Sequence, residues 1–152
     1  MDYLKELTAI QTWVKAVTGL NSYRLREAKP KVARPVILWE NPSRSRDRNI
    51  SRYQYVNRVR QYGRLFVSSL DEALTIQEQL LKDLEEKVGV LAIEENGVKL
   101  GVLKAVEIEF TDSDSLDIPF NIVYEVTYGR TRPADPPNAT TVTTKIINHY
   151  DE

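Results

Sequence analysis

The 152-residue sequence contains no cysteine and a single histidine, His149. Without cysteine there are no disulfides, no thiol nucleophiles and no sulfur-ligated zinc or iron–sulfur centres. With one histidine near the end of the sequence, most histidine-based catalysis and histidine-ligated metals are excluded too, and serine nucleophiles lack a base. These absences favour a non-enzymatic protein without a cofactor.

The sequence also lacks a glycine-rich phosphate-binding loop, because its six glycines are scattered along the chain. No apolar run reaches the roughly 18 residues that a membrane span needs, and the first residues lack the basic and apolar regions of a secretory signal. We therefore expect a cytoplasmic protein with no membrane partner. The length suits one domain with a sizeable core.

Charge is abundant but unevenly distributed. Residues 1–69 hold 14 Lys and Arg against 5 Asp and Glu, roughly +9, whereas residues 70–152 hold 7 against 17, roughly −10. The basic half is most concentrated in residues 44–64, which contain no lysine and the following arginines: Arg44, Arg46, Arg48, Arg52, Arg58, Arg60 and Arg64. Such asymmetry suggests a partner, which the residues leave open as nucleic acid, the chain's own acidic half, or the acidic half of an identical neighbour.

Two amphipathic helices are predicted. The first begins at the N-cap Asp2, ends at Gly19, and has an apolar stripe of Leu4, Leu7, Ile10, Val14 and Val17. The second begins with a capping box formed by Ser69 and Glu72 and ends at Gly89. We expect its core-facing stripe to be Leu70, Leu74, Leu81, Leu84 and Val88.

The remaining patterns predict strands. Residues 34–40 form a buried strand, 43–52 a polar arginine-rich loop, and 53–68 a long strand with a bulge near Gly63. Asn96-Gly97 joins a hairpin, and residues 106–110 and 118–128 alternate as two further strands. The order predicts an α+β domain over residues 1–133, with two helices packed on a mostly antiparallel sheet. Residues 134–152 form a Pro/Thr-rich flexible C-terminal tail, in which residues 140–147 can add a strand to a neighbour or remain disordered.

The acidic loop, residues 112–117, contains Asp112, Asp114 and Asp117. Alternate carboxylates can converge on a calcium ion, but the glycine and the bidentate glutamate of an EF-hand loop are missing. We therefore expect a solvated turn and no metal. A small metal-dependent enzyme is the corresponding alternative.

The arginine segment carries interleaved tyrosines, as single-stranded nucleic-acid grooves do. Against that interpretation, the sequence pI is about 6.0, and the tyrosines alternate as strand packing requires. A solvated loop without a partner is a further possibility. A protein interface accounts best for arginines without lysine, because the planar guanidinium forms bidentate pairs with carboxylates.

The order of helix, long strand, capped helix, hairpin and the strand at residues 118–128 resembles the tail terminator, or tail-to-head joining, proteins of long-tailed bacteriophages and prophage-like particles. The resemblance covers residues 1–133. It implies a small virion assembly protein, made in the bacterial cytoplasm, that forms a homohexameric ring on the virion tail. The ring stops polymerisation of the tail tube and provides a docking surface for the neck or connector protein.

The resemblance implies no catalytic or cofactor residues, and nucleic acid only as DNA passing through the ring. Within such a ring we expect Arg44, Arg46, Arg48 and Arg52 of one subunit to approach the acidic loop of the next, since complementary charge sets register. Alternatively, those arginines line the lumen or the docking face. The alternative functions are another neck or head-completion protein, or a nucleic-acid-binding accessory protein that uses residues 44–64.

Overall fold

The computed structural model of the chain describes residues 2–25 and 33–130. The predicted tail at 134–152, including residues 140–147 and His149, lies outside the described residues. In the described part, two helices and seven strands follow in the order α1 (Tyr3–Thr18), β1 (Ser22–Arg24), β2 (Val36–Trp39), β3 (Ser43–Asn49), β4 (Gln54–Phe66), α2 (Leu70–Glu86), β5 (Leu91–Glu95), β6 (Val98–Phe110) and β7 (Asp117–Gly129).

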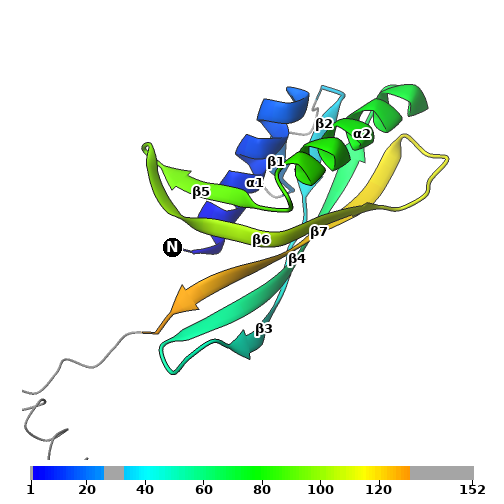
Figure 1. The fold of residues 1–152 in the computed structure, drawn as a ribbon. Coiled ribbons are helices and arrows are strands. Elements are labelled where there is room, and N and C mark those ends of the chain that lie inside the picture. Colours follow the sequence, from blue (N-terminus) through cyan, green and yellow to red (C-terminus); the bar gives the residue numbers. More distant parts are fainter. Residues whose placement is uncertain (1, 26–32, 131–152) are drawn as a thin grey trace, which may run out of the picture.

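The strands form a sheet in the order β1-β2-β4-β7-β6-β5, and β3 pairs with β4 beyond the end of β2. Only the β1–β2 pair is parallel among the described strands. Both helices lie over one side of the sheet, whereas β3 and the adjoining ends of β4 and β7 extend past them (Figure 1). The α+β class and the mostly antiparallel sheet are as predicted.

Helix α1 begins and ends as its sequence predicts. The Asp2 carboxylate accepts from the Lys5 amide at 3.1 Å, and Gly19, with φ of 77°, donates its N–H to the Lys15 carbonyl. Trp13 faces the core and donates its Nε1–H to Asp83 Oδ2 of α2 at 2.6 Å. A hydrogen bond from Lys87 to Asp83 holds the pKa of that carboxyl below its usual range, so the acceptor stays ionised. The two helices are thereby joined.

Helix α2 has its capping box, but it turns a different face to the core from the one predicted. Ser69 Oγ accepts from the Glu72 amide, and Glu72 accepts from the amide of Ser68. Of the predicted stripe only Leu84 is buried, together with Ala73, Ile76 and Leu80, whereas Leu70, Leu74, Leu81 and Val88 are exposed. The two apolar stripes lie about 90° apart around the helix axis. Periodicity cannot choose between them, and packing against α1 and β6 selects the one with Leu80.

The predicted polar loop at residues 43–52 was wrong in its first part, because residues 43–49 form strand β3. All seven residues of β3 are polar and none is buried, so no apolar alternation marks the strand in the sequence. The strand forms because it pairs with β4, and the register of this pairing shifts at Asp47. The chain therefore forms an arginine-rich hairpin, and residues 50–53, its tip, connect β3 to β4.

Strand β4 carries no bulge near Gly63, contrary to prediction, because it pairs with β7 without a register shift from Gln54 to Phe66. Its core-facing positions include Gln61 and Gly63, and this polar residue and this glycine conceal the alternation in the sequence. A Cβ at Gly63 would lie 2.7 Å from Phe120 Cζ and 3.0 Å from Trp39 Cε3. The glycine is thus required by two aromatic rings that pack over the backbone.

Gly63→Ala is expected to lower the free energy of unfolding by about 1–3 kcal/mol, because both rings must move to admit a methyl group. Urea unfolding followed by circular dichroism measures the change. Gly129→Ala is the matched control, since a Cβ there meets only the Tyr53 carbonyl oxygen at 3.8 Å. Equal stability of the two variants would contradict the packing explanation.

The predicted hairpin at Asn96-Gly97 and the alternation of β7 are confirmed. The second strand of the predicted hairpin and the strand predicted at residues 106–110 are one continuous strand, β6. Its pairing with β7 shifts register between Lys104 and Glu107, where Ala105 has φ of 49°. This bulge lets β6 pair with β5 over one half and with β7 over the other. The core lies between the helices and the sheet, with buried side chains contributed by β2, β4, β5, β6 and β7.

Candidate interaction surface

The arginines of residues 44–64 divide into those bound within the chain and those that are not. Arg44 of β3 is bound, because its Nη1 lies 2.9 Å from Oε1 of Glu6 on α1. Glu6 is fully buried and also accepts hydrogen bonds from Tyr124 Oη at 2.9 Å and from Tyr128 Oη. The pKa of Tyr124 is raised mainly by burial and, to a smaller extent, by the nearby Glu6 charge, so the Tyr124 hydroxyl remains a hydrogen-bond donor.

The same cluster continues to Gln61 through Tyr3. The Arg44 guanidinium lies 5.2 Å from the centre of the Tyr3 ring, and the Tyr3 hydroxyl donates to Gln61 Oε1. Gln61 is fully buried and donates to the carbonyls of Glu40 and Tyr62. Burial raises the pKa of Tyr3 as well. We call Glu6, Arg44, Tyr3, Tyr124, Tyr128 and Gln61 the Glu6 cluster, which ties α1 to the hairpin and to β7.

Sequence reasoning missed this cluster. The available signal was the position of Glu6 four residues before Ile10, on the side of the helix that Ile10 and Val14 share. A carboxylate on that side requires a buried cation or donors, and Arg44 and two tyrosines supply them.

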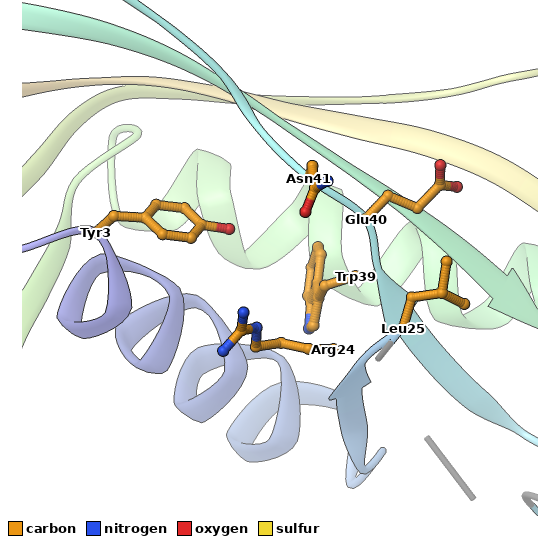
Figure 2. Close-up of a pocket in the computed structure, with 6 residues that line it drawn as sticks. All are labelled: Tyr3, Arg24, Leu25, Trp39, Glu40 and Asn41. Carbon is orange, nitrogen blue, oxygen red and sulfur yellow. The ribbon is translucent and has the colours of Figure 1, made fainter. Parts of the chain in front are cut away.

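A pocket of about 250 Å³ lies beside the cluster between α1, β1 and β2. Tyr3, Arg24 and Trp39 point toward one another across it, whereas the Glu40 carboxylate turns away (Figure 2). That carboxylate binds Arg64 Nε at 2.9 Å, and the Tyr3 hydroxyl is bound to Gln61. The indole Nε1 of Trp39 is buried without a partner among the described residues. Most polar groups of the pocket therefore hold the chain together.

Two further residues predicted for the interface, Arg48 and Asp117, are paired on the sheet. Arg48 contacts Glu125 at 3.2 Å and Asp47 at 2.5 Å, and these hydrogen bonds raise its pKa. Arg64 contacts Glu40 at 2.9 Å and Asp117 at 3.0 Å, with the same consequence for its pKa. Some arginines of the basic half are therefore paired with carboxylates of the acidic half within the same chain.

The remaining charges lie at separate places. Arg46 and Arg58 form no ion pair within residues 2–25 and 33–130, and Arg52 contacts the Tyr53 ring at 5.7 Å. Arg60 donates to Asn121 and also has no acidic partner among these residues. In the same described ranges, the unpaired acidic residues on β6 and in the acidic loop are Glu107, Glu109, Asp112 and Asp114.

Among these unpaired residues, Arg46 and Arg52 of the hairpin cannot reach the acidic loop, because the long axis of the sheet separates them. Arg46 pairs with Asn57 on β4, whereas Asp117, at the end of the acidic loop, pairs with Phe66. The two positions on β4 are separated by about 30 Å of extended strand. The hairpin tip and the acidic loop lie at opposite ends of the molecule (Figure 1). Contact between Arg46 or Arg52 and the acidic loop therefore requires a second molecule.

No group of three or more His, Cys, Asp or Glu side chains in the described residues is arranged to hold a metal ion. No helix in residues 2–25 or 33–130 is long and apolar enough to cross a membrane.

No family model matches the sequence, and no curated protein matches it. Among solved structures, one chain aligns with 88% of this chain and 99% of its own at 16% identity, with a TM-score of 0.45. A likeness of this degree supports no statement about function.

Proposed function

We propose that this chain is a non-enzymatic virion assembly protein that associates with itself head to tail into a ring. The ring caps the tail tube of a phage or prophage-like particle, stops its polymerisation, and provides the docking surface for the head or neck. The observation that carries self-association is the placement of unpaired Arg46 and Arg52 and of unpaired Asp112 and Asp114 at opposite ends of one sheet.

A cyclic interface brings one surface of a subunit against a different surface of the next. The chain offers such a pair of surfaces, because Arg46 and Arg52 belong to the hairpin and Asp112 and Asp114 to the acidic loop. Arg44, Arg48 and Asp117, from the interface predicted by sequence, are held by partners in their own chain. In the proposed interface they keep the hairpin and the loop in shape.

Exposed ion pairs contribute only about 0–1 kcal/mol each. The charges therefore steer the encounter and set the register of the ring, and apolar contacts supply most of the affinity. The proposed number of six subunits, and the tail tube and neck as partners, rest on the resemblance in element order to tail terminator proteins.

The test uses the purified chain and the tube protein of the same particle. Sedimentation velocity of the chain alone should show a discrete ring species, and adding the chain to polymerising tube protein should give short tubes with a ring at one end by electron microscopy. A chain that stays monomeric at every concentration and leaves tube length unchanged would contradict the proposal. Rings that form without changing tube length would support the proposed self-association but contradict the proposed capping of the tail tube.

A further inference from the structure

The tip of the β3–β4 hairpin presents an exposed isoleucine. Ile50 is 54% exposed, and Arg48 and Arg52 flank it in the sequence. The amides of Ile50 and Ser51 both donate to the Gln54 carbonyl, at 2.9 and 3.1 Å, so the turn is closed on itself. A large apolar side chain on a rigid, cationic turn suits insertion into a partner.

Arg130, which follows β7, braces the tip from the neighbouring strand. Its guanidinium donates to the Arg52 carbonyl at 3.1 Å and to Asn49 Oδ1 at 2.6 Å, and it lies 4.8 Å from the centre of the Tyr55 ring. The position of Ile50 is therefore set before any partner binds. Preorganisation of this kind lowers the entropy lost on association.

The opposite end of the molecule contains a matching groove. It has a volume of about 460 Å³ and lies between the start of α2 and the acidic loop. Leu70, Leu74, Phe110 and Ile118 contribute apolar surface, and Asp112 and Asp114 contribute carboxylates. Leu74, 62% exposed, belongs to the α2 stripe that the core does not use.

We propose that the hairpin tip of one copy seats in this groove of the next, with Ile50 against Leu70 and Leu74 and with Arg52 beside Asp112 and Asp114. The inference rests on the self-association proposed above and names its contact. Apolar surface meets apolar surface and cation meets carboxylate, which is the complementarity expected of a specific interface. The hairpin tip and the acidic loop that lines the groove lie at opposite ends of one sheet (Figure 1), so no copy can fill its own groove. Repeated with the same rotation, the head-to-tail contact propagates from copy to copy, and it gives a ring where that rotation closes.

The absence of native cysteine makes the contact directly testable. In the full-length double variant Ile50→Cys, Leu74→Cys, a short bis-maleimide should produce a ladder of covalent oligomers, because a link between these positions within one chain is out of reach. Mixing the two single variants should give covalent dimers only. The matched control is Val98→Cys, Leu74→Cys, in which the first cysteine lies on a different exposed apolar position, and it should give no ladder.

Ile50→Asp should weaken self-association about 10- to 100-fold, as loss of one buried isoleucine predicts. Its urea unfolding midpoint should match that of the native chain, because Ile50 is exposed in the monomer. The matched control Val98→Asp should leave self-association unchanged.

The outcomes separate this contact from the ring itself. Native rings with neither a ladder nor an effect of Ile50→Asp would overturn the tip contact and leave self-association standing. A tip-to-groove ladder without a discrete native ring would support the contact and reject the ring. The absence of both would overturn both. An equal ladder from the Val98 control would overturn the tip contact alone, since that ladder reports random collision. A cross-link from Leu74→Cys to added tube protein, in place of the ladder between copies, would mean that the groove binds the tube, and would overturn a second copy as its occupant.

Discussion

Glu6→Ala is expected to lower the free energy of unfolding by about 3 kcal/mol, a large part of the 5–15 kcal/mol typical of a domain this size. The substitution leaves Arg44 without its carboxylate at a site where the Arg44 side chain is only 27% exposed. It also leaves the buried Tyr124 hydroxyl without an acceptor, together with a cavity where the carboxylate was. Glu6→Gln, which keeps the volume and one acceptor, should cost roughly half as much.

Urea unfolding at neutral pH, followed by tryptophan fluorescence, measures both losses. Glu95→Ala is the matched control, because Glu95 pairs with Lys5 of the same helix but is exposed, and its removal should cost less than about 1 kcal/mol. An equal, small effect of all three substitutions would show that the Glu6 cluster does not hold α1 to the sheet. Because the cluster also binds β3, Glu6→Ala should increase amide hydrogen exchange in the hairpin more than in β5.

The double charge reversal Arg46→Glu, Arg52→Glu is expected to abolish ring formation with little effect on the stability of the monomer. Neither side chain forms an ion pair with a described residue, so folding does not depend on their charge. In the proposed interface, each reversal replaces attraction to Asp112 and Asp114 by repulsion. Like charges placed against one another at an interface cost several kcal/mol. Sedimentation velocity at low and high salt measures the loss.

Lys82→Glu, Lys99→Glu makes the same change of net charge at exposed positions of α2 and β6 and should leave the rings intact. Combining the reversed arginines with Asp112→Lys and Asp114→Lys should restore the rings, because the signs are exchanged together. Rings that survive the arginine reversal would contradict the charge complementarity. Salt-dependent retention of a single-stranded oligonucleotide by the native chain, lost in the reversed variant, would assign these arginines to nucleic acid instead.

Features that depend on a few neighbouring residues were predicted correctly. Asp2, Ser69 and Glu72 cap helices with their own side chains, and Asn96-Gly97 adopts positive φ in a two-residue turn. The alternation along β7 follows from one face packed in the core. In each case the local backbone or a regular period supplies the physical cause.

Features that depend on distant residues were not predicted. Helix α2 carries two apolar stripes that share the correctly predicted Leu84, and only the positions of α1 and β6 select Ala73, Ile76 and Leu80 for the core. Strand β3 has no apolar face and exists because β4 offers a free edge. Gly63 reads as a bulge in the sequence, yet it is needed by Trp39 and Phe120 from two other strands.

The amino-acid sequence by itself determined the α+β class, the helix caps, the tight turn and the separation of charge into two halves, because each follows from composition or from residues close together in the chain. Only the tertiary structure decided which charges are neutralised internally. It brought Arg44 to Glu6, Arg48 to Glu125 and Arg64 to Asp117, and it left Arg46 and Asp112 at opposite ends of the sheet. The physical reason is that ion pairing depends on distance in space, and strand pairing sets that distance between residues far apart in sequence.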